Sequence, residues 1–173
     1  RDSSQANFDT AAAAADVAYI PGTCDCQGLA DKLTLAPVGI VSEHIGCYDD
    51  LLYSNQAGVD YSADEILILD NTNPITTPYS ISQIVTVLSD PAGALNRLKG
   101  GQAPGLQRLA RRLQQDQTVM GAIDAGGFLY GGQPAPARRV MLPWGSDSFD
   151  NSWLNDEGWG ITRRAVEWAA GSL

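Results

Sequence analysis

Three cysteines and one histidine are the residues with the clearest chemical potential in this chain. Cys24, Cys26, His44 and Cys47 are the only residues of these two types. In one interpretation, Cys47 pairs with Cys24 or Cys26 as a disulfide in an oxidising compartment, and the third thiol stays free or pairs between molecules. In a second, the C-x-C and H-x-x-C spacings supply a Cys₃His zinc site. In a third, Cys24 or Cys26 is a hydrolase nucleophile and His44 its base.

A second group with possible chemistry lies in the loop over residues 144–157. Trp144 and Trp153 stand among Gly, Ser and Asp residues, and exposed tryptophans anchor partner proteins or sugar rings. Asp147 and Asp150 belong to an oxygen-rich run that would suit Ca²⁺. The loop is thus a candidate carbohydrate- or calcium-binding module. The competing interpretation is a structural loop that ends in the N-cap of a helix.

Buried strands must position these residues. Short apolar runs without polar alternation predict strands covered on both faces, as in parallel α/β sheets, at 16–20, 37–41 and 64–69. In such a sheet, ligands bind beyond the carboxyl ends of the strands. Those ends carry Pro21 to Cys26, Glu43 to Cys47, and Asp70 to Asn73. Because neighbouring loops meet there, this geometry favours the disulfide from Cys24 or Cys26 to Cys47.

Weaker patterns predict the remaining elements. Residues 1–10 read as a polar arm, and residues 1–15 precede a single α/β domain over 16–173. Asn155 is a predicted N-cap, followed by a helix with Ile161, Ala165 and Trp168 on one face. The other segments are short helices near 26–35 and 48–53, strands at 83–88 and 139–143, a loop at 91–105, a segment at 105–114 whose spacing favours a helix, and a hairpin of 118–124 with 127–130.

Composition excludes several classes of function. The formal net charge of −9 over 173 residues disfavours nucleic acid and anionic membranes as main partners. No apolar run approaches the roughly 20 residues of a membrane span, so membrane insertion is not expected. Neither G-x-G-x-x-G after a strand nor a Walker-type sequence occurs, so no cofactor is expected. The many Gly and Asp residues and the few Lys residues fit an extracellular or cell-surface protein.

Several short motifs resemble one known family. Asn71-Thr-Asn-Pro-Ile-Thr76, after an apolar strand ending in Asp70, is similar to the D-x-x-H-P-I-T turn of glutamine-amidotransferase-like, flavodoxin-like domains, with Asn73 in place of the histidine. The resemblance extends to their parallel strands and to their closing strand and helix, in the segments 15–20, 36–41, 136–143, 155–159 and 165–171. It implies a three-layer, mostly parallel sheet with a C-terminal helix.

The departures from this family bear on function. The nucleophile elbow, a cysteine between glycines, is missing, because Thr23 and Asp25 flank Cys24, and no histidine follows His44. Glutamine hydrolysis is therefore not implied. The family begins with a strand–helix–strand unit, but here only residues 1–15 precede Asp16. We therefore expect a sheet truncated at its N-terminal edge.

An open edge has consequences for binding. The strand formed by Asp16, Val17, Ala18, Tyr19 and Ile20 would present unpaired backbone groups, which invite pairing with another chain. We therefore predict a secreted, non-catalytic structural or interaction domain that is a processed subunit. Its partner would be a further copy of the chain, in an oligomer or filament, or a cleaved N-terminal fragment. The Cys/His hydrolase and the binding module at 144–157 are the alternatives.

Overall fold

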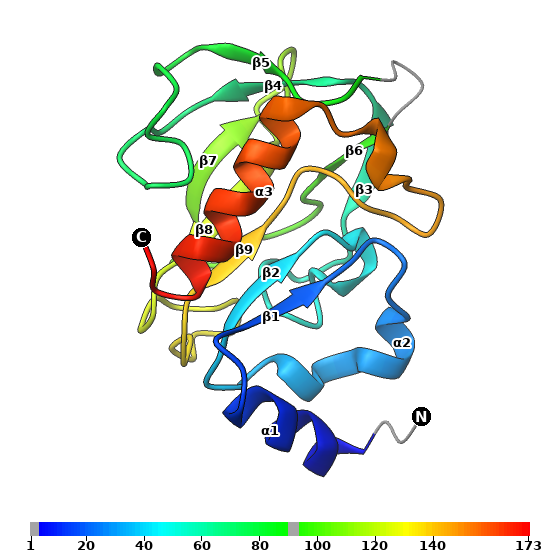
Figure 1. The fold of residues 1–173 in the computed structure, drawn as a ribbon, viewed down its shortest axis with the longest axis vertical. Helices are drawn as coiled ribbons and strands as arrows, with labels where there is room; N and C mark the ends of the chain where they lie inside the picture. Colours follow the sequence, from blue (N-terminus) through cyan, green and yellow to red (C-terminus); the bar gives the residue numbers. More distant parts are fainter. Residues whose placement is uncertain (1–3, 90–93) are drawn as a thin grey trace.

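The computed structural model describes residues 4–89 and 94–173 and shows an α/β fold around one mixed seven-stranded sheet (Figure 1). The strands follow the order β1-β2-β9-β8-β7-β4-β5. Their bounds are β1 Val17–Ile20, β2 Gly39–Ser42, β4 Glu65–Ile68, β5 Ile84–Thr86, β7 Gln107–Arg111, β8 Thr118–Ile123 and β9 Arg139–Met141. A separate two-stranded sheet joins β3 Val59–Ser62 to β6 Ala94–Arg97. The helices are α1 Gln5–Ala13, α2 Cys26–Leu29 and α3 Asp156–Ala169, and the 3₁₀ turns are η1 Ala30–Leu33, η2 Ile45–Cys47 and η3 Asn151–Trp153.

The sheet divides into a parallel part and an antiparallel part. β1, β2 and β9 run parallel, with Val17 opposite Gly39 and Val41 opposite Val140. From β9 through β8, β7, β4 and β5 every pairing is antiparallel. The expectation of parallel strands at 16–20 and 37–41 is therefore confirmed. β4 forms within the expected 64–69 segment but runs opposite to β1 and β2.

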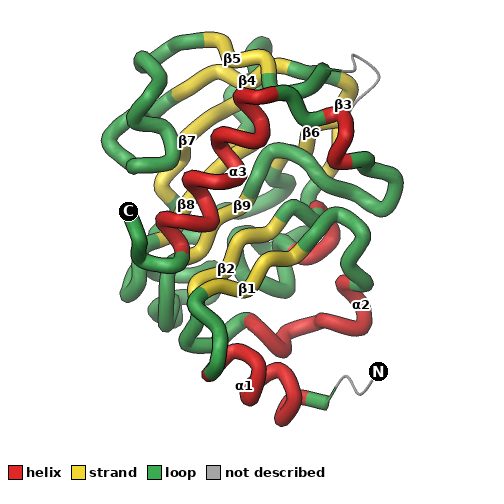
Figure 2. The backbone as a smooth tube through the Cα atoms, in the orientation of Figure 1, coloured by secondary structure: helices red, strands yellow, loops and turns green. Residues whose placement is uncertain are grey.

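Side chains of alternate strand residues build a core on each face of the sheet. Val41 and Val140 face the core beneath α3, whereas Ile40 and Met141 face the core formed with α2 and η1. Figure 2 shows α3 lying across the sheet, with α2 and α1 beside β1. α3 approaches β2 so closely that a Cβ on Gly39 would lie 2.1 Å from the Ala169 carbonyl oxygen. Only glycine fits there.

The C-terminal helix begins and packs as its sequence predicts. The Asn155 side chain accepts a hydrogen bond from the Gly158 amide at 3.0 Å, the geometry of an N-cap. Ile161, Ala165 and Trp168 are buried against the sheet. None of the helices within the described ranges has the length and apolarity needed to cross a lipid bilayer.

Two predicted elements, the helix at 105–114 and the hairpin, differ in the structure. The segment at 105–114 contains strand β7, not a helix. The strand lies inside the sheet between β4 and β8, and it is covered on both faces, because the successive residues Leu109 and Ala110 are both buried. The predicted hairpin does not form. β8 pairs with β7 and β9 instead, and Phe128 bridges to Pro134.

Other differences concern segments expected to lack regular structure. The N-terminal arm is helical from Gln5 to Ala13, and the predicted loop at 91–105 contains β6 within its described part, whereas residues 91–93 lie outside the described residues. The short helix expected near 48–53 does not form: these residues make turns that follow the single 3₁₀ turn η2, which ends at Cys47. β6 forms because it pairs with β3, which is distant in sequence.

Candidate functional site

Three loops converge beyond the carboxyl ends of the parallel strands β1, β2 and β9. The loops after β1 and β2 were expected there. The third predicted loop, Asp70 to Asn73, lies at the opposite edge because β4 is antiparallel to β2. The segment after β9 takes its place and brings Trp144 and Gly145 against Glu43. We call the meeting point of these three loops the carboxyl-edge cluster.

Glu43 is the centre of this cluster. Its side chain is fully buried and accepts hydrogen bonds from the Tyr19 hydroxyl, from the Gly22 amide at 3.0 Å and from the Trp144 indole at 3.3 Å. Burial, and then the neighbouring Glu43, raise the pKa of Tyr19, so the phenol remains a donor. The carboxylate therefore ties all three loops together. Sequence reasoning placed Glu43 at this edge but assigned it no role, because nothing local in the sequence shows its three donors.

A disulfide joins the loops after β1 and β2. Cys26 bonds to Cys47 with a Cα–Cα distance of 5.2 Å, within the usual range for such bonds. This is one of the two pairings expected from the sequence, and Cys24 is the free thiol. Burial, and then the nearby Asp25, raise the pKa of the Cys24 thiol. Cys24 is thus protonated at neutral pH.

His44 has two partners, and neither is Cys24. Its Nδ1 accepts from the Gly46 amide at 2.9 Å, and its Nε2 lies 3.0 Å from the Asp147 carboxylate. A Cys/His hydrolase requires a reactive thiolate beside the base. The geometry gives this alternative no support, because Cys26 is bonded to Cys47 and the Cys24 thiol is protonated. Of the four residues named for a zinc site, Cys26, His44 and Cys47 come together, and Cys24 does not belong to the group.

The 144–157 loop differs from an exposed binding loop. Trp144 is fully buried. Trp153 is half-buried and makes an edge-to-face contact with Phe149, with the two ring centroids 5.5 Å apart. Asp150 is the N-cap of η3, and its side chain accepts a hydrogen bond from the Ser152 amide. This hydrogen bond lowers the pKa of the Asp150 carboxyl group. Asp147 is exposed except for its bond to His44. Within the described ranges, no three carboxylates of this loop converge on a cation position.

The outer side of β1 has free backbone groups. The Ile20 carbonyl accepts a hydrogen bond from the Glu43 amide. Because the backbone N–H and C=O groups of alternate strand residues point to the same side, those of Ile20 and Ala18 face β2. Those of Val17 and Tyr19 face away from the sheet, and no backbone or side-chain hydrogen bond reaches them from elsewhere in residues 4–89 and 94–173. α1 does not supply the missing strand, because its residues are helical. Among the described residues, β1 is therefore an open edge.

A small apolar groove accompanies this edge. It has a volume of about 280 Å³ and lies between α1 and β1. Alanines form much of its wall, and Phe8, Leu33 and Tyr19 complete it. An extended segment paired with β1 would point every second side chain toward this groove.

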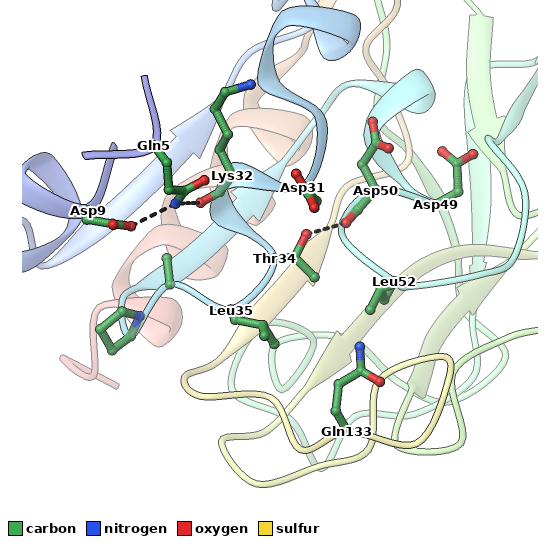
Figure 3. Close-up of a pocket in the computed structure, with 12 residues that line it drawn as sticks. Gln5, Asp9, Asp31, Lys32, Thr34, Leu35, Asp49, Asp50, Leu52 and Gln133 are labelled. Atoms are coloured by element: carbon green, nitrogen blue, oxygen red, sulfur yellow. Dashed lines mark hydrogen bonds between the residues drawn. The ribbon is translucent and has the colours of Figure 1, made fainter. Parts of the chain in front are cut away.

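An acidic hollow of about 600 Å³ is lined by residues of α1, of η1 and of the segment after η2 (Figure 3). Its lining includes four carboxylates, those of Asp9, Asp31, Asp49 and Asp50. The Lys32 ammonium donates a hydrogen bond to the Gly28 carbonyl at 2.7 Å. Burial, and then Asp49 and Asp31, raise the pKa of the Asp50 carboxyl group. These carboxylates do not converge on one point, so the hollow is a region of negative potential and not a built cation site.

Comparisons with known proteins bear on the fold alone. No family model matches the chain, and no curated protein sequence matches it. A solved structure described as cytoplasmic protein STM1381 from Salmonella typhimurium LT2 is similar in fold, with a TM-score of 0.55 over 99% of this chain and 74% of that one. The sequences are 10% identical. The disulfide is compatible with an extracellular location, whereas that neighbour is described as cytoplasmic.

Proposed function

We propose that this chain is a non-catalytic interaction domain that self-associates by pairing β1 with β1 of a second copy. The observation that carries the proposal is the open edge of β1 with its unpaired Val17 and Tyr19 backbone groups. Natural edge strands are commonly protected by charges, prolines or bulges. β1, with the sequence VAYI, has none of these. A flavodoxin-like layer arrangement and an extracellular location are parts of the same proposal.

The edge is complementary to itself. In an antiparallel pair around a two-fold axis at Ala18, Val17 lies opposite Tyr19 of the second copy, and Tyr19 opposite its Val17. Residues in such hydrogen-bonded positions exchange two bonds per pair, which gives four bonds. At about 1 kcal/mol each, they contribute about 4 kcal/mol, which offsets only the lower end of the roughly 4–15 kcal/mol that association costs in translational and rotational freedom. Apolar contacts along the groove would strengthen the dimer toward the micromolar range.

The opposite edge of the sheet is partly covered, at the end of β5. The Asn155 side chain donates to the Thr86 carbonyl, and the Asn155 amide donates to the Val87 carbonyl, so the segment before α3 contacts the end of β5. A single self-complementary edge produces a two-fold dimer, whereas a filament needs two different open surfaces.

The proposal is tested by sedimentation velocity of the whole chain over a concentration series, with two kinds of variant. Ala11→Lys puts a charge on the groove wall, and Ala13→Lys is the matched control on an exposed face of α1 outside the groove. Val17→Pro removes an outward amide and leaves the bonds to β2 in place. We expect concentration-dependent dimers for the wild type and Ala13→Lys, and monomers for Ala11→Lys and Val17→Pro.

Two results would contradict this proposal. One is a wild-type monomer throughout the series up to 1 mM. The other is an association that neither Ala11→Lys nor Val17→Pro weakens. A monomer that nevertheless binds an added apolar strand peptide at β1 would replace self-association by docking of a different segment, such as a cleaved N-terminal fragment.

A further inference from the structure

The Cys26–Cys47 disulfide and His44 lie together where the loops after β1 and β2 meet. The two sulfurs and one imidazole nitrogen are all within 4.8 Å of one another, and this is the only such group of three within the described residues. We propose that Cys26, His44 and Cys47 form a redox-dependent zinc site. The sulfurs bond to each other in the oxidised protein, and they bind Zn²⁺ together with His44 in the reduced protein.

The spacing of the ligand atoms suits this metal. Zinc binds sulfur at about 2.3 Å and imidazole nitrogen at about 2.0–2.1 Å, so ligand atoms in a tetrahedral site are about 3.4–3.8 Å apart. Atoms that already lie within 4.8 Å reach these distances by side-chain rotation. The Cα atoms of Cys26 and Cys47, 5.2 Å apart, can remain where they are.

His44 is oriented as zinc-bound histidines are. A histidine that binds zinc through one nitrogen commonly donates its other N–H to a carboxylate. In His44, Nε2 lies 3.0 Å from the Asp147 carboxylate, which leaves the lone pair on Nδ1. Nδ1 and the Cys26 sulfur both lie beside Gly46, since a Cβ built on Gly46 would be 3.1 Å from Nδ1 and 3.6 Å from that sulfur. Zinc would replace the Gly46 amide as the partner of Nδ1.

Charge balance favours the same assignment. Cys47 and His44 are buried, and an unbalanced charge at such a position is costly. Two thiolates, one neutral imidazole and Zn²⁺ sum to zero. Cys24 does not provide the fourth ligand, because it lies outside the group of converging atoms. Three protein ligands leave one position open for water.

The change between the two states is a two-electron step. A dithiol reductant is oxidised to its disulfide, and the Cys26–Cys47 bond accepts two electrons and two protons to give two thiols. Zinc binding then releases both thiol protons. The disulfide and the metal close the same loop, from α2 to η2, so each state holds His44 beside the carboxyl-edge cluster.

The test compares metal binding by the oxidised and reduced chain. The protein is reduced with a phosphine, desalted without oxygen and titrated with Co²⁺ and then Zn²⁺. We expect thiolate-to-cobalt absorption at one metal per chain in the reduced protein and none in the oxidised protein. His44→Gln is expected to lower zinc affinity at least tenfold, Asp147→Asn about tenfold through the orientation of His44, and Cys24→Ser to leave it unchanged.

A thermal measurement covers the case in which reduction unfolds the chain. Zinc is then expected to raise the melting temperature of the reduced wild type but not that of the Cys26→Ser, Cys47→Ser double variant. The proposal is overturned if the reduced wild type shows neither cobalt–thiolate absorption nor a zinc-dependent rise in melting temperature. It is also overturned if His44→Gln binds zinc as tightly as the wild type.

Discussion

Replacing Glu43 by Gln tests whether one buried carboxylate holds the carboxyl-edge cluster together. Three donors converge on this side chain, from Tyr19, Gly22 and Trp144. Tyr19 and Trp144 donate to one carboxylate oxygen of Glu43 and Gly22 donates to the other, so a glutamine that keeps its oxygen in the first position points its NH₂ group at the Gly22 amide. Hydrogen bonds to charged groups contribute about 1.5–3 kcal/mol each, so the loss of the Gly22 bond costs about 1.5–3 kcal/mol in the free energy of unfolding. The melting temperature of a chain of this length should fall by about 5 °C.

The assay is urea unfolding at pH 7, followed by far-UV circular dichroism. Glu65→Gln is the matched control, because Glu65 has a single long bond to Thr86 at 3.3 Å at an exposed position, and it should change the free energy by less than about 0.5 kcal/mol. A double-mutant cycle with Trp144→Phe should show coupling between Glu43 and Trp144. A loss below about 1 kcal/mol for Glu43→Gln, or strict additivity in the cycle, would refute the central role of Glu43.

Three further outcomes are expected from the same unfolding assay. Gly39→Ala should lower stability by several kcal/mol through contact with the Ala169 carbonyl, whereas Gly160→Ala, on the open face of α3, should raise it by about 0.5–1 kcal/mol; equal effects would contradict the close approach of α3. Replacing Cys26 and Cys47 by Ser should cost about 3 kcal/mol, since the disulfide closes a loop with a sequence separation of 21; an unchanged midpoint would contradict this. The pKa of Asp70 is lowered by the Thr72 amide and by Gln107, so its stabilisation is present above the unfolded pKa of about 3.9 and lost as pH falls through the folded pKa. The pKa of Asp50 is raised by burial, so its charged form destabilises the fold. Asp70→Asn should therefore lower stability at pH 7 and Asp50→Asn should raise it, and both differences should shrink toward pH 3; effects of the same sign would contradict these assignments.

Local sequence patterns determined the elements whose own residue pattern shows which of their faces is buried. The apolar runs of β1 and β2 and the amphipathic helix after Asn155 need only burial on the expected faces. The Cys47 disulfide was restricted to two partners because parallel strands bring consecutive loops to one edge. These features depend on residue spacing, which the sequence contains.

The tertiary structure alone decided the direction of β4 and the residues of the carboxyl-edge cluster. β7 has helical spacing, yet it forms a strand because β4 and β8 supply its hydrogen bonds. Trp144 follows β9 and reaches Glu43 across 101 positions of sequence, and Asp147 reaches His44 across 103. Contacts at such separations depend on how the sheet is assembled. When a strand runs in the opposite direction, the loop that follows it emerges at the opposite end of the sheet. For this reason Asp70 and Asn73 lie away from the cluster and Trp144 lies at its centre.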